Sequence, residues 1–300
     1  MGPFLRKGDT VAVVAPGFAV RPPALRAGIE ALRRMGFEVR VGEHALSRHG
    51  YLAGTDAERL SDLNRALRDP KVGGIWFARG GYGTARLLDR VDWKALAQGP
   101  ARVFVGYSDL TALFSPILRD SGSVCVYGPV VSELGDPRTY NPASLRAALG
   151  GESFCVSFPP ARTLRAGRAR GRLLGGNLTV LSHLLGTPHA PDLRGALVLL
   201  EDVGEEVYRI DRMLQHLTMA GALGQAAGIV LGSFRAPHRT RSFPPDRPLL
   251  EVVREALGTL GVPVVRGLPA GHVARKRALP LGAVASLDTR AGTLEVAGRS

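Results

Sequence analysis

The sequence predicts an α/β protein whose first half forms a parallel β-sheet with helices on both faces. Over the first 130 residues, short runs of Val, Ile and Phe alternate with segments in which Leu recurs at helical spacing. Strand and helix patterns that alternate in this way are typical of parallel sheets, because each helix carries the chain back to start the next strand. The second half mixes helical segments with several short strands, which predicts a second, mixed α/β domain.

The elements of the first half follow one another in a regular order. Helical patterns end at clear stops, such as Gly36 after the first helix and Pro70 after the second. The expected strands are 11–15, 37–41, 75–77, 103–105 and 124–126. The expected helices span 25–35 and 60–67, start again at 85, and continue from 110 to 118. Ligands of such sheets bind beyond the carboxyl ends of the strands, which is where we look for a site.

Residues 131–170 differ from the sequence on either side, and we place the domain boundary there. They are rich in Gly and Pro and contain most of an arginine cluster. The predicted N-terminal domain covers 1–135, the linker 136–170 and the C-terminal domain 171–300. In the last of these, helices are expected at 178–185, 209–219 and 249–257. Its expected strands are 196–200, 229–231, 262–265, 284–287 and 294–296.

The charge of the chain identifies no particular partner. It has 39 Lys and Arg residues against 26 Asp and Glu, a net charge of +13 that would suit nucleic acid. The arginines are scattered, and the cluster between Arg162 and Arg172 is interleaved with Gly and Ala rather than with aromatic residues that stack on bases. We therefore expect no nucleic-acid partner, and we keep a non-catalytic nucleic-acid-binding module as the alternative of another class.

Cysteines, metal motifs and apolar runs set further bounds. Two cysteines, Cys125 and Cys155, are too few for a disulfide framework or a zinc site. The chain shows neither an HExxH motif nor a Cys-rich site that would argue for a metal, and we expect no cofactor. No apolar run approaches the roughly 18 residues of a membrane-spanning helix, and the N-terminus lacks the apolar core of a signal peptide. These features predict a cytoplasmic protein with no membrane partner.

The tetrapeptide Gly106-Tyr107-Ser108-Asp109 is the strongest candidate for a nucleophile. It follows the apolar run 103–105 and precedes the helical pattern 110–118. A strand, a corner of small residues and a helix describe an elbow that lifts a serine hydroxyl above the end of a sheet. Serine is a weak nucleophile by itself, so the interpretation requires a base and a third group that orients the base.

Among the seven histidines, His272 is the best placed to act as that base. It follows the expected strand 262–265 through a loop and is preceded by Gly271. A carboxylate that could orient it is Glu201, at the tip of the apolar run 196–200. Asp109 is a rival orienter, and its side chain is also suited to capping the helix that it begins.

Seven short motifs, each weak alone, together resemble the LD-carboxypeptidase family. This is serine peptidase family S66, which includes the microcin C7 self-immunity peptidases. The similarity covers nearly the whole chain, and the motifs occur in the family's order. They lie at 8–16, 51–59, 79–83, 106–109, 175–178, 200–212 and 271–282. The chain departs from the family at Tyr127, where His is frequent, and at Lys276, where Asn is frequent.

The resemblance implies a fold and a catalytic triad. The fold would be a flavodoxin-like N-terminal domain followed by a mixed α/β domain that resembles a swivelling β-barrel. The triad would be Ser108 as nucleophile, His272 as general base and Glu201 as its partner, divided between the two domains. We expect the backbone N–H groups of Asp109 and Gly81 to form the oxyanion hole, because the residue after the nucleophile and a glycine loop are usual donors.

The resemblance also implies a substrate and an assembly. The substrate would be the cytoplasmic murein tetrapeptide, cut between the L-centre of its diamino acid and the terminal D-alanine during peptidoglycan recycling. Arg79, beside Gly80, is a candidate partner for the terminal carboxylate, because guanidinium groups bind carboxylates through two hydrogen bonds. The family implies a homodimer that needs no metal. The nearest alternative is a microcin-immunity activity that cleaves peptidyl-nucleotides or aminoacyl-nucleotides.

Overall fold

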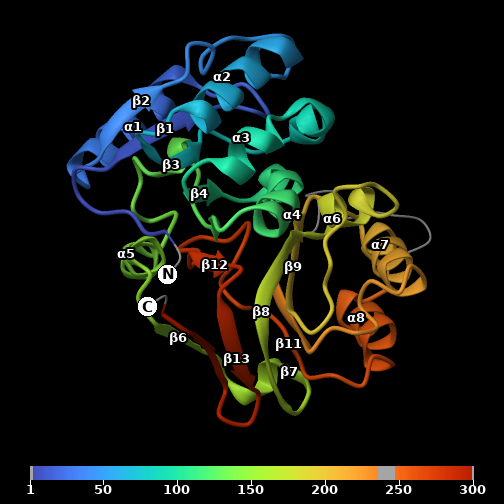
Figure 1. The fold of residues 1–300 in the computed structure, drawn as a ribbon. Helices are drawn as coiled ribbons and strands as arrows, with labels where there is room; N and C mark the ends of the chain where they lie inside the picture. The colour runs from blue at the N-terminus through green and yellow to red at the C-terminus, as the bar shows by residue number, and fades with distance from the viewer. Residues whose placement is uncertain (1–2, 236–246, 299–300) are drawn as a thin grey trace. The chain divides into compact units, whose positions relative to one another are not determined.

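The computed structural model describes residues 3–235 and 247–298, which form two compact units (Figure 1). Unit 1 comprises the described residues up to Glu152, the later segment Ala274–Leu281 and Gly298. Unit 2 comprises the described residues of Ser153–Val273 together with Gly282–Ala297. The chain therefore passes from unit 1 into unit 2, returns to unit 1 for a short segment after Val273, and then completes unit 2.

The sheet of unit 1 has six strands in the order β12-β5-β4-β3-β1-β2. The strands are β1 (Thr10–Val14), β2 (Glu38–Val41), β3 (Val72–Phe77), β4 (Val103–Gly106), β5 (Val124–Tyr127) and β12 (Leu279–Leu281). The first five are parallel, whereas β12 pairs antiparallel with β5 at the edge. Strands β1, β4 and β5 are buried along their whole length, which explains why their sequences are continuous apolar runs rather than alternating ones.

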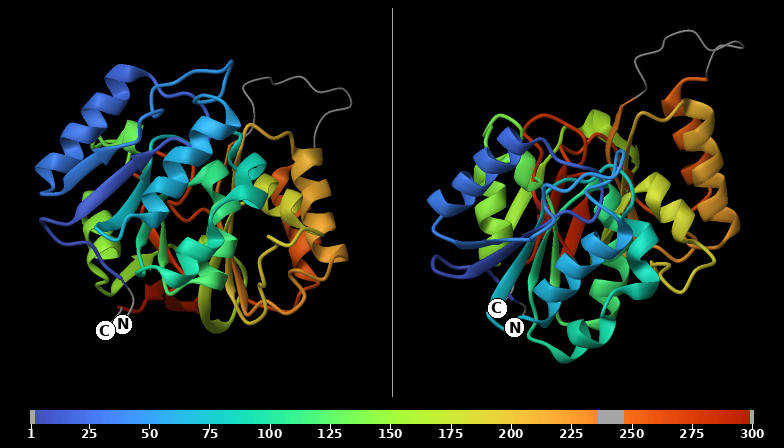
Figure 2. Two further views of the ribbon diagram at one scale, coloured as in Figure 1. Left: turned by 45° about the horizontal axis from the view of Figure 1, so that its top comes forward. Right: turned by 90° about the horizontal axis from the view of Figure 1, so that it is seen from above.

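Helices cover both faces of this sheet, as the sequence predicts. The helices are α1 (Pro22–Arg34), α2 (Asp56–Arg68), α3 (Trp93–Gln98), α4 (Thr111–Asp120) and α5 (Pro142–Gly150), with short 3₁₀ turns η1 (Thr84–Arg90), η2 (Ser108–Leu110) and η3 (Val131–Glu133). The connection from β1 to β2 runs in one direction across the sheet, and those from β2 to β5 run in the other. Because such crossovers are right-handed, α1 lies on one face and α2, α3 and α4 lie on the other (Figure 2).

Unit 2 contains a mixed sheet of eight strands in the order β6-β14-β13-β8-β9-β10-β11-β7. Its central strands, β8 to β11, are parallel, and the outer ones are antiparallel. Their bounds are β6 (Phe154–Ser157), β7 (Thr163–Arg165), β8 (Arg168–Asn177), β9 (Leu197–Val203), β10 (Gly228–Arg235), β11 (Val264–Val265), β13 (Val284–Asp288) and β14 (Thr293–Val296). A parallel centre places the carboxyl ends of β8, β9, β10 and β11 at one edge of the sheet.

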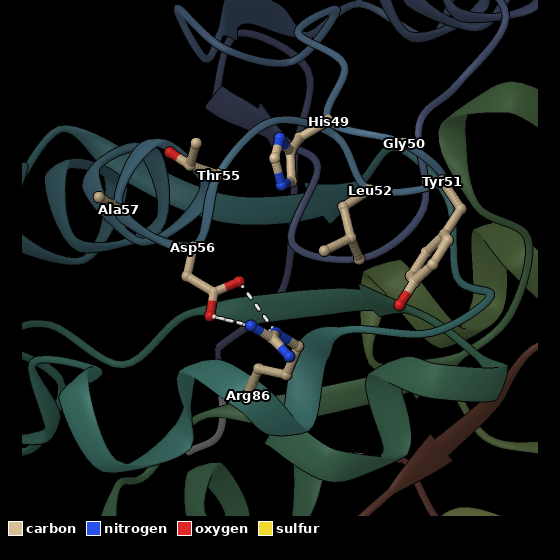
Figure 3. Close-up of a pocket in the computed structure, with 8 residues that line it drawn as sticks. All are labelled: His49, Gly50, Tyr51, Leu52, Thr55, Asp56, Ala57 and Arg86. Atoms are coloured by element: carbon tan, nitrogen blue, oxygen red, sulfur yellow. Dashed lines mark hydrogen bonds and ion pairs between the residues drawn. The ribbon is translucent and has the colours of Figure 1, made fainter.

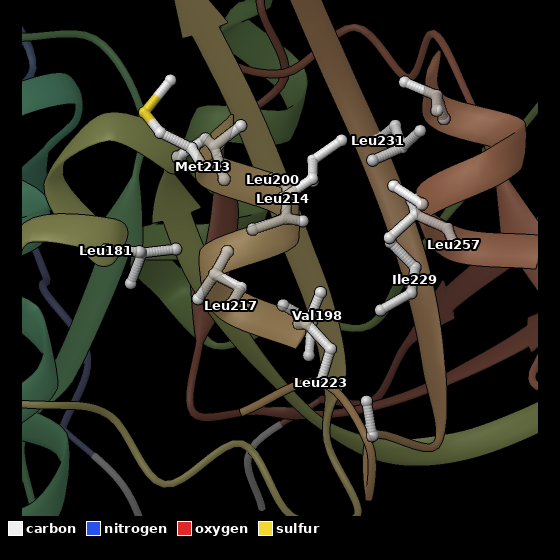
Figure 4. Packing of buried hydrophobic residues seen from close by; sticks show 14 of the residues in the cluster. Leu181, Val198, Leu200, Met213, Leu214, Leu217, Leu223, Ile229, Leu231 and Leu257 are labelled. Atoms are coloured by element: carbon white, nitrogen blue, oxygen red, sulfur yellow. The ribbon is translucent and has the colours of Figure 1, made fainter. Parts of the chain in front are cut away.

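Three helices pack on the parallel part of this sheet and close its core. They are α6 (Leu178–Leu184), α7 (Val207–Met219) and α8 (Leu249–Gly258). Alternate residues of the strands, such as Val198 on β9 and Ile229 on β10, meet Leu214 and Leu217 of α7 in one apolar cluster (Figure 4). This cluster makes β9 a rigid support for the polar residues near its carboxyl end.

The observed α/β architecture confirms the predicted fold class, and several short elements add to it. The predicted division into 1–135, 136–170 and 171–300 stays a prediction. In the structure, the stretch 136–170 supplies α5, β6, a 3₁₀ turn η4 (Pro160–Arg162), β7 and the start of β8. The arginines at 168, 170 and 172 alternate along β8 and are exposed. Arg168 forms an ion pair with Asp288 of the neighbouring β13, at 2.6 Å.

Candidate active site

Ser108 stands on a sharp turn between β4 and α4, in unit 1. Tyr107 is extended, with φ −157°, and Ser108 then takes φ +67°, in the left-handed region that residues with a side chain rarely enter. The backbone N–H of Ser108 donates to the hydroxyl of Tyr127 at 3.2 Å. A Cβ on Gly80 would lie 3.1 Å from Cβ of Ser108, so the neighbouring loop approaches the turn closely because it has no side chain there.

The side chain of Asp109 holds this turn to the glycine loop, and it does not cap its own helix. Its Oδ2 accepts hydrogen bonds from the backbone N–H of Thr84, at 2.9 Å, and from the Thr84 hydroxyl, at 2.6 Å. Thr84 is the first residue of η1, whereas the N-cap position of α4 is Leu110, which makes no side-chain cap. The expectation that Asp109 caps the helix it begins is therefore wrong, because Asp109 lies within the 3₁₀ turn η2 and its carboxylate bonds to Thr84. Burial raises the pKa of its carboxyl.

The glycine loop 79–83 lies beside Ser108, but Arg79 already has partners. Its guanidinium donates to the carbonyl of Ala19 at 2.9 Å and lies over the ring of Phe18, 5.6 Å from the ring centre. Gly81 has φ +104°, and a Cβ on it would come within 2.4 Å of the Phe18 ring. The loop thus requires glycine at 81 for its backbone conformation and for the close approach of Phe18.

Glu201 and His272 form a hydrogen-bonded pair within unit 2. The carboxylate of Glu201 lies near the carboxyl end of β9 and is fully buried. Its Oε2 is 2.7 Å from Nδ1 of His272 and accepts the backbone N–H of His272 at 3.1 Å. The His272 side chain is 18% exposed. A proton on Nδ1 is held by the carboxylate, which leaves Nε2 as the basic nitrogen of the ring.

Asn177 contacts the carboxylate of Glu201 and is itself held by Asp202, and sequence reasoning gave neither residue a role. Asn177, at the end of β8, pairs in register with Glu201 and places its amide 3.4 Å from Oε1. The same amide donates to Asp202 at 3.1 Å, and Asp202 also accepts from Thr179. Asn177 lies in the Gly-Gly-Asn-Leu motif at 175–178, and this motif is the sequence feature that could have indicated its role. These contacts fix the carboxylate that orients His272.

Gly271 leaves the space that the Glu201 carboxylate occupies. It has φ +84°, and a Cβ built on it would lie 2.1 Å from Oε2 of Glu201. Gly232 on β10 is close on another side, where a Cβ would lie 3.0 Å from Cβ of Glu201. The sequence feature that made His272 a candidate, a glycine directly before it, is therefore a packing requirement of the Glu201–His272 pair.

The structure brings the predicted site residues together in two sets. Ser108, Asp109, Gly80, Gly81 and Arg79 form the set in unit 1. Glu201 and His272 form the set in unit 2. Each set lies at or near the carboxyl ends of parallel strands.

A pocket of about 620 Å³ in unit 1 contains none of these residues (Figure 3). Figure 3 shows Arg86 facing Asp56, to which it donates from Nε and Nη2 at 2.8 to 3.1 Å. Tyr51 and His49 line the pocket from the preceding loop. Because its charged groups are already paired, we assign this pocket no part in the chemistry. Within the described chain, no cluster of three His, Cys, Asp or Glu side chains could hold a metal ion.

Substituting Ser108 by glycine should remove the backbone strain of this turn. A side chain at φ +67° costs about 1–2 kcal/mol of stability. Glycine adopts this conformation freely, but it lowers stability by about 0.5–1 kcal/mol because it loses more conformational entropy on folding. We expect Ser108→Gly to unfold at a temperature equal to or above that of Ser108→Ala. Thermal unfolding of the two variants measures this difference, and a clearly less stable glycine variant would contradict the strain at this turn.

A serine on a left-handed strand-to-helix turn and a histidine backed by a buried glutamate are the parts of a serine-type hydrolase. Residues 11–128 match the N-terminal domain of LD-carboxypeptidases, and residues 170–287 match their C-terminal domain. The chain therefore belongs to the LD-carboxypeptidase family, as its motifs predict, and it is a serine-type carboxypeptidase. This result favours an enzyme over the nucleic-acid-binding alternative.

Similarity to individual relatives extends over nearly the whole chain. The probable murein peptide carboxypeptidase of Bacillus subtilis is 38% identical over 293 residues, which cover 95% of this chain and 90% of that protein. The murein tetrapeptide carboxypeptidase of Pseudomonas aeruginosa is 35% identical over 294 residues, which cover 93% and 92%. Both relatives are named as carboxypeptidases of murein peptides.

Solved structures share the fold. The muramoyltetrapeptide carboxypeptidase of Oxalobacter formigenes has a TM-score of 0.85 and 31% identity, with 96% of this chain and 98% of that chain covered. The microcin C7 self-immunity protein MccF has a TM-score of 0.86 and 23% identity, with 100% and 98% covered. At that identity MccF shows the fold alone. None of the helices in residues 3–235 and 247–298 is long and apolar enough to cross a membrane.

Proposed function

We propose that this protein removes the terminal D-alanine from a murein tetrapeptide through the triad Ser108, His272 and Glu201. The observation that carries the proposal is the buried contact of 2.7 Å between Glu201 Oε2 and His272 Nδ1. A buried carboxylate that holds Nδ1 fixes the tautomer and the orientation of a histidine base. The left-handed turn at Ser108 supports its role as the nucleophile, because a strained turn of this kind presents a serine hydroxyl at the end of a strand.

The reaction begins with attack of Ser108 Oγ on the carbonyl carbon of the L-centred diamino acid. His272 Nε2 takes the hydroxyl proton, and Glu201 stabilises the imidazolium that forms. The tetrahedral intermediate collapses, the bond to D-alanine breaks, and His272 returns the proton to the leaving amine. Water then attacks the acyl-enzyme with His272 again as base, which releases the tripeptide and restores Ser108.

The developing oxyanion and the terminal carboxylate need partners in unit 1. We assign the oxyanion to the backbone N–H groups of Asp109 and Gly81. Loss of one such donor lowers turnover by about 10²-fold to 10³-fold. The contact of Asp109 with Thr84 supports this role, because it ties the nucleophile turn to the glycine loop. We assign the substrate carboxylate to Arg79, beside Gly80. Arg79 is exposed, and one of its nitrogens is held by Ala19.

The choice of substrate rests on the relatives. Proteins 38% and 35% identical over most of this chain are named as murein peptide and murein tetrapeptide carboxypeptidases. We propose that the chain acts on the same class of peptide, in the cytoplasm, during peptidoglycan recycling, and as a homodimer. The second candidate is cleavage of an aminoacyl-nucleotide, because MccF, with the same fold, has been solved with aspartyl sulfamoyl adenosine. Its lower identity of 23% ranks it second.

Mass spectrometry of the products tests the proposed reaction. The wild-type protein is incubated with tetrapeptides that end in D-alanine and carry diaminopimelate, lysine or ornithine at the third position, and in a parallel sample with aspartyl sulfamoyl adenosine. We expect release of D-alanine and a tripeptide from at least one tetrapeptide. The same peptides ending in L-alanine are the control. Cleavage of the nucleotide analogue alone would replace the proposal by the second candidate.

A further inference from the structure

Lys276 is a buried lysine whose partners lie beside the nucleophile turn. Its side chain is only 4% exposed. Its ammonium donates to Oε1 of Glu133 at 2.8 Å and to the carbonyl of Thr139 at 3.2 Å. It also lies 4.9 Å from the centre of the Tyr107 ring, within range of a cation–π contact. A lysine is rarely buried to this extent unless its charge is paired. These contacts therefore allow the ammonium group of Lys276 to be buried.

Glu133 joins Lys276 to the residue that precedes the nucleophile. The same Oε1 accepts the hydroxyl of Tyr107 at 2.8 Å, and Oε2 accepts the backbone N–H of Val130 at 3.3 Å. The ring of Tyr107 packs edge-on against that of Tyr127, with centres 6.0 Å apart. Tyr127 in turn accepts the backbone N–H of Ser108. Contacts therefore run without interruption from Lys276 to the backbone of Ser108.

The backbone near Lys276 is itself strained. Within the described part of the chain, the non-glycine residues with positive φ are Ser108, at +67°, and Arg275, at +54°. Arg275 directly precedes Lys276, and its N–H donates to the carbonyl of Arg138 at 3.1 Å. Strain of this kind persists only where surrounding contacts enforce it, and it is found at functional sites. Here the two strained residues lie at opposite ends of one contact network.

We propose that the Lys276–Glu133 ion pair is a positioning element for the nucleophile. It fixes the hydroxyl and the ring of Tyr107, and through Tyr107 and Tyr127 it holds Ser108 in its left-handed conformation. The inference rests on the proposed role of Ser108. Lys276 and Glu133 themselves are assigned no contact with the substrate. Their loss should therefore reduce the fraction of molecules in which the Ser108 turn has a reactive geometry. This effect lowers kcat more than it raises KM.

A matched control comes from Arg102, which lies just before the start of β4, whereas the nucleophile turn lies at the end of that strand. Arg102 is 1% exposed, precedes β4, and donates to the carbonyls of Val72, Pro100 and Asp69. Arg102→Met therefore removes a buried cation from unit 1 and leaves the turn after β4 unchanged. A loss of activity caused by destabilisation alone would appear in this variant as well.

The experiment compares kcat, KM and the unfolding temperature of six variants with those of the wild type, with D-alanine release as the assay. The variants are Lys276→Met, Glu133→Gln, the double variant of these two, Lys276→Arg, Arg102→Met and Ser108→Ala. We expect Lys276→Met and Glu133→Gln each to lower kcat by about 10-fold to 100-fold, with KM little changed, because small displacements of reacting groups have effects of this size. The double variant should lose no more than either single variant, and Lys276→Arg should keep most of the activity.

Two outcomes would overturn the inference, and a third would overturn the mechanism on which it rests. If kcat per folded protein falls equally in Arg102→Met and Lys276→Met, the ion pair only stabilises the fold. If Lys276→Met and Glu133→Gln both retain wild-type kcat, the pair does not position the turn. If Ser108→Ala retains activity, the proposed nucleophile is wrong and the failure belongs to the proposed function.

Discussion

Gly271→Ala is expected to remove nearly all activity, although residue 271 has no functional group of its own. The new Cβ would lie 2.1 Å from Oε2 of Glu201 and 2.4 Å from its Cδ. The carboxylate must then move away from Nδ1 of His272, because the added Cβ is bonded directly to the backbone of residue 271 and has no rotation that avoids the collision. Loss of the carboxylate partner of a catalytic histidine lowers turnover by about 10⁴-fold. Measurement of kcat for D-alanine release gives the size of the effect.

Two comparisons separate this effect from backbone strain. Gly261 has a similar φ of +74°, and a Cβ on it meets nothing within 4 Å, so Gly261→Ala introduces the strain without the collision. We expect that variant to lose stability and to keep its activity. In a Glu201→Ala background the colliding atoms are gone, so adding Gly271→Ala should reduce kcat little further. A large additional loss in that background would show that residue 271 acts by another route.

The nucleophile turn could be recognised from the sequence because its determinants are local. An apolar run at 103–105, a corner of small and polar residues and a helical pattern lie next to one another in the chain. The left-handed conformation of Ser108 fits this pattern. The pairing of Glu201 with His272 was a weaker inference, since a strand tip and a loop 71 residues apart had to be matched by position and by family resemblance.

The contacts that support these residues could not be predicted, because they join segments far apart in the sequence. Asp109 bonds to Thr84 across 25 residues rather than to its own helix. Lys276 reaches Glu133 across 143 residues, through a short segment that returns to unit 1 and forms the edge strand β12. Strand β12 has three residues and contains a proline, so neither its length nor its composition marks it as a strand. Side-chain partners of this kind appear only once the fold is known.

The largest effects are expected from Ser108 and His272, and they should not add. In the proposed mechanism, Ser108→Ala removes the attacking oxygen, and His272→Ala removes the group that activates it. Each should lower kcat by about 10⁴-fold to 10⁶-fold, as in other serine hydrolases in which these residues act as a unit. The double variant should be no slower than either single variant, because the second residue has no function once the first is absent. Residual turnover would come from the proposed oxyanion donors, the backbone N–H groups of Asp109 and Gly81.

A second serine–histidine pair in unit 2 provides the control. Ser182 Oγ lies 3.1 Å from Nδ1 of His216, so distance alone does not distinguish this pair from a catalytic one. Ser182 is 4% exposed within helix α6, however, and its hydroxyl cannot reach a substrate. Ser182→Ala and His216→Ala should therefore retain activity. If they abolish it, or if losses at Ser108 and His272 multiply in the double variant, the two residues do not act as nucleophile and base of one reaction.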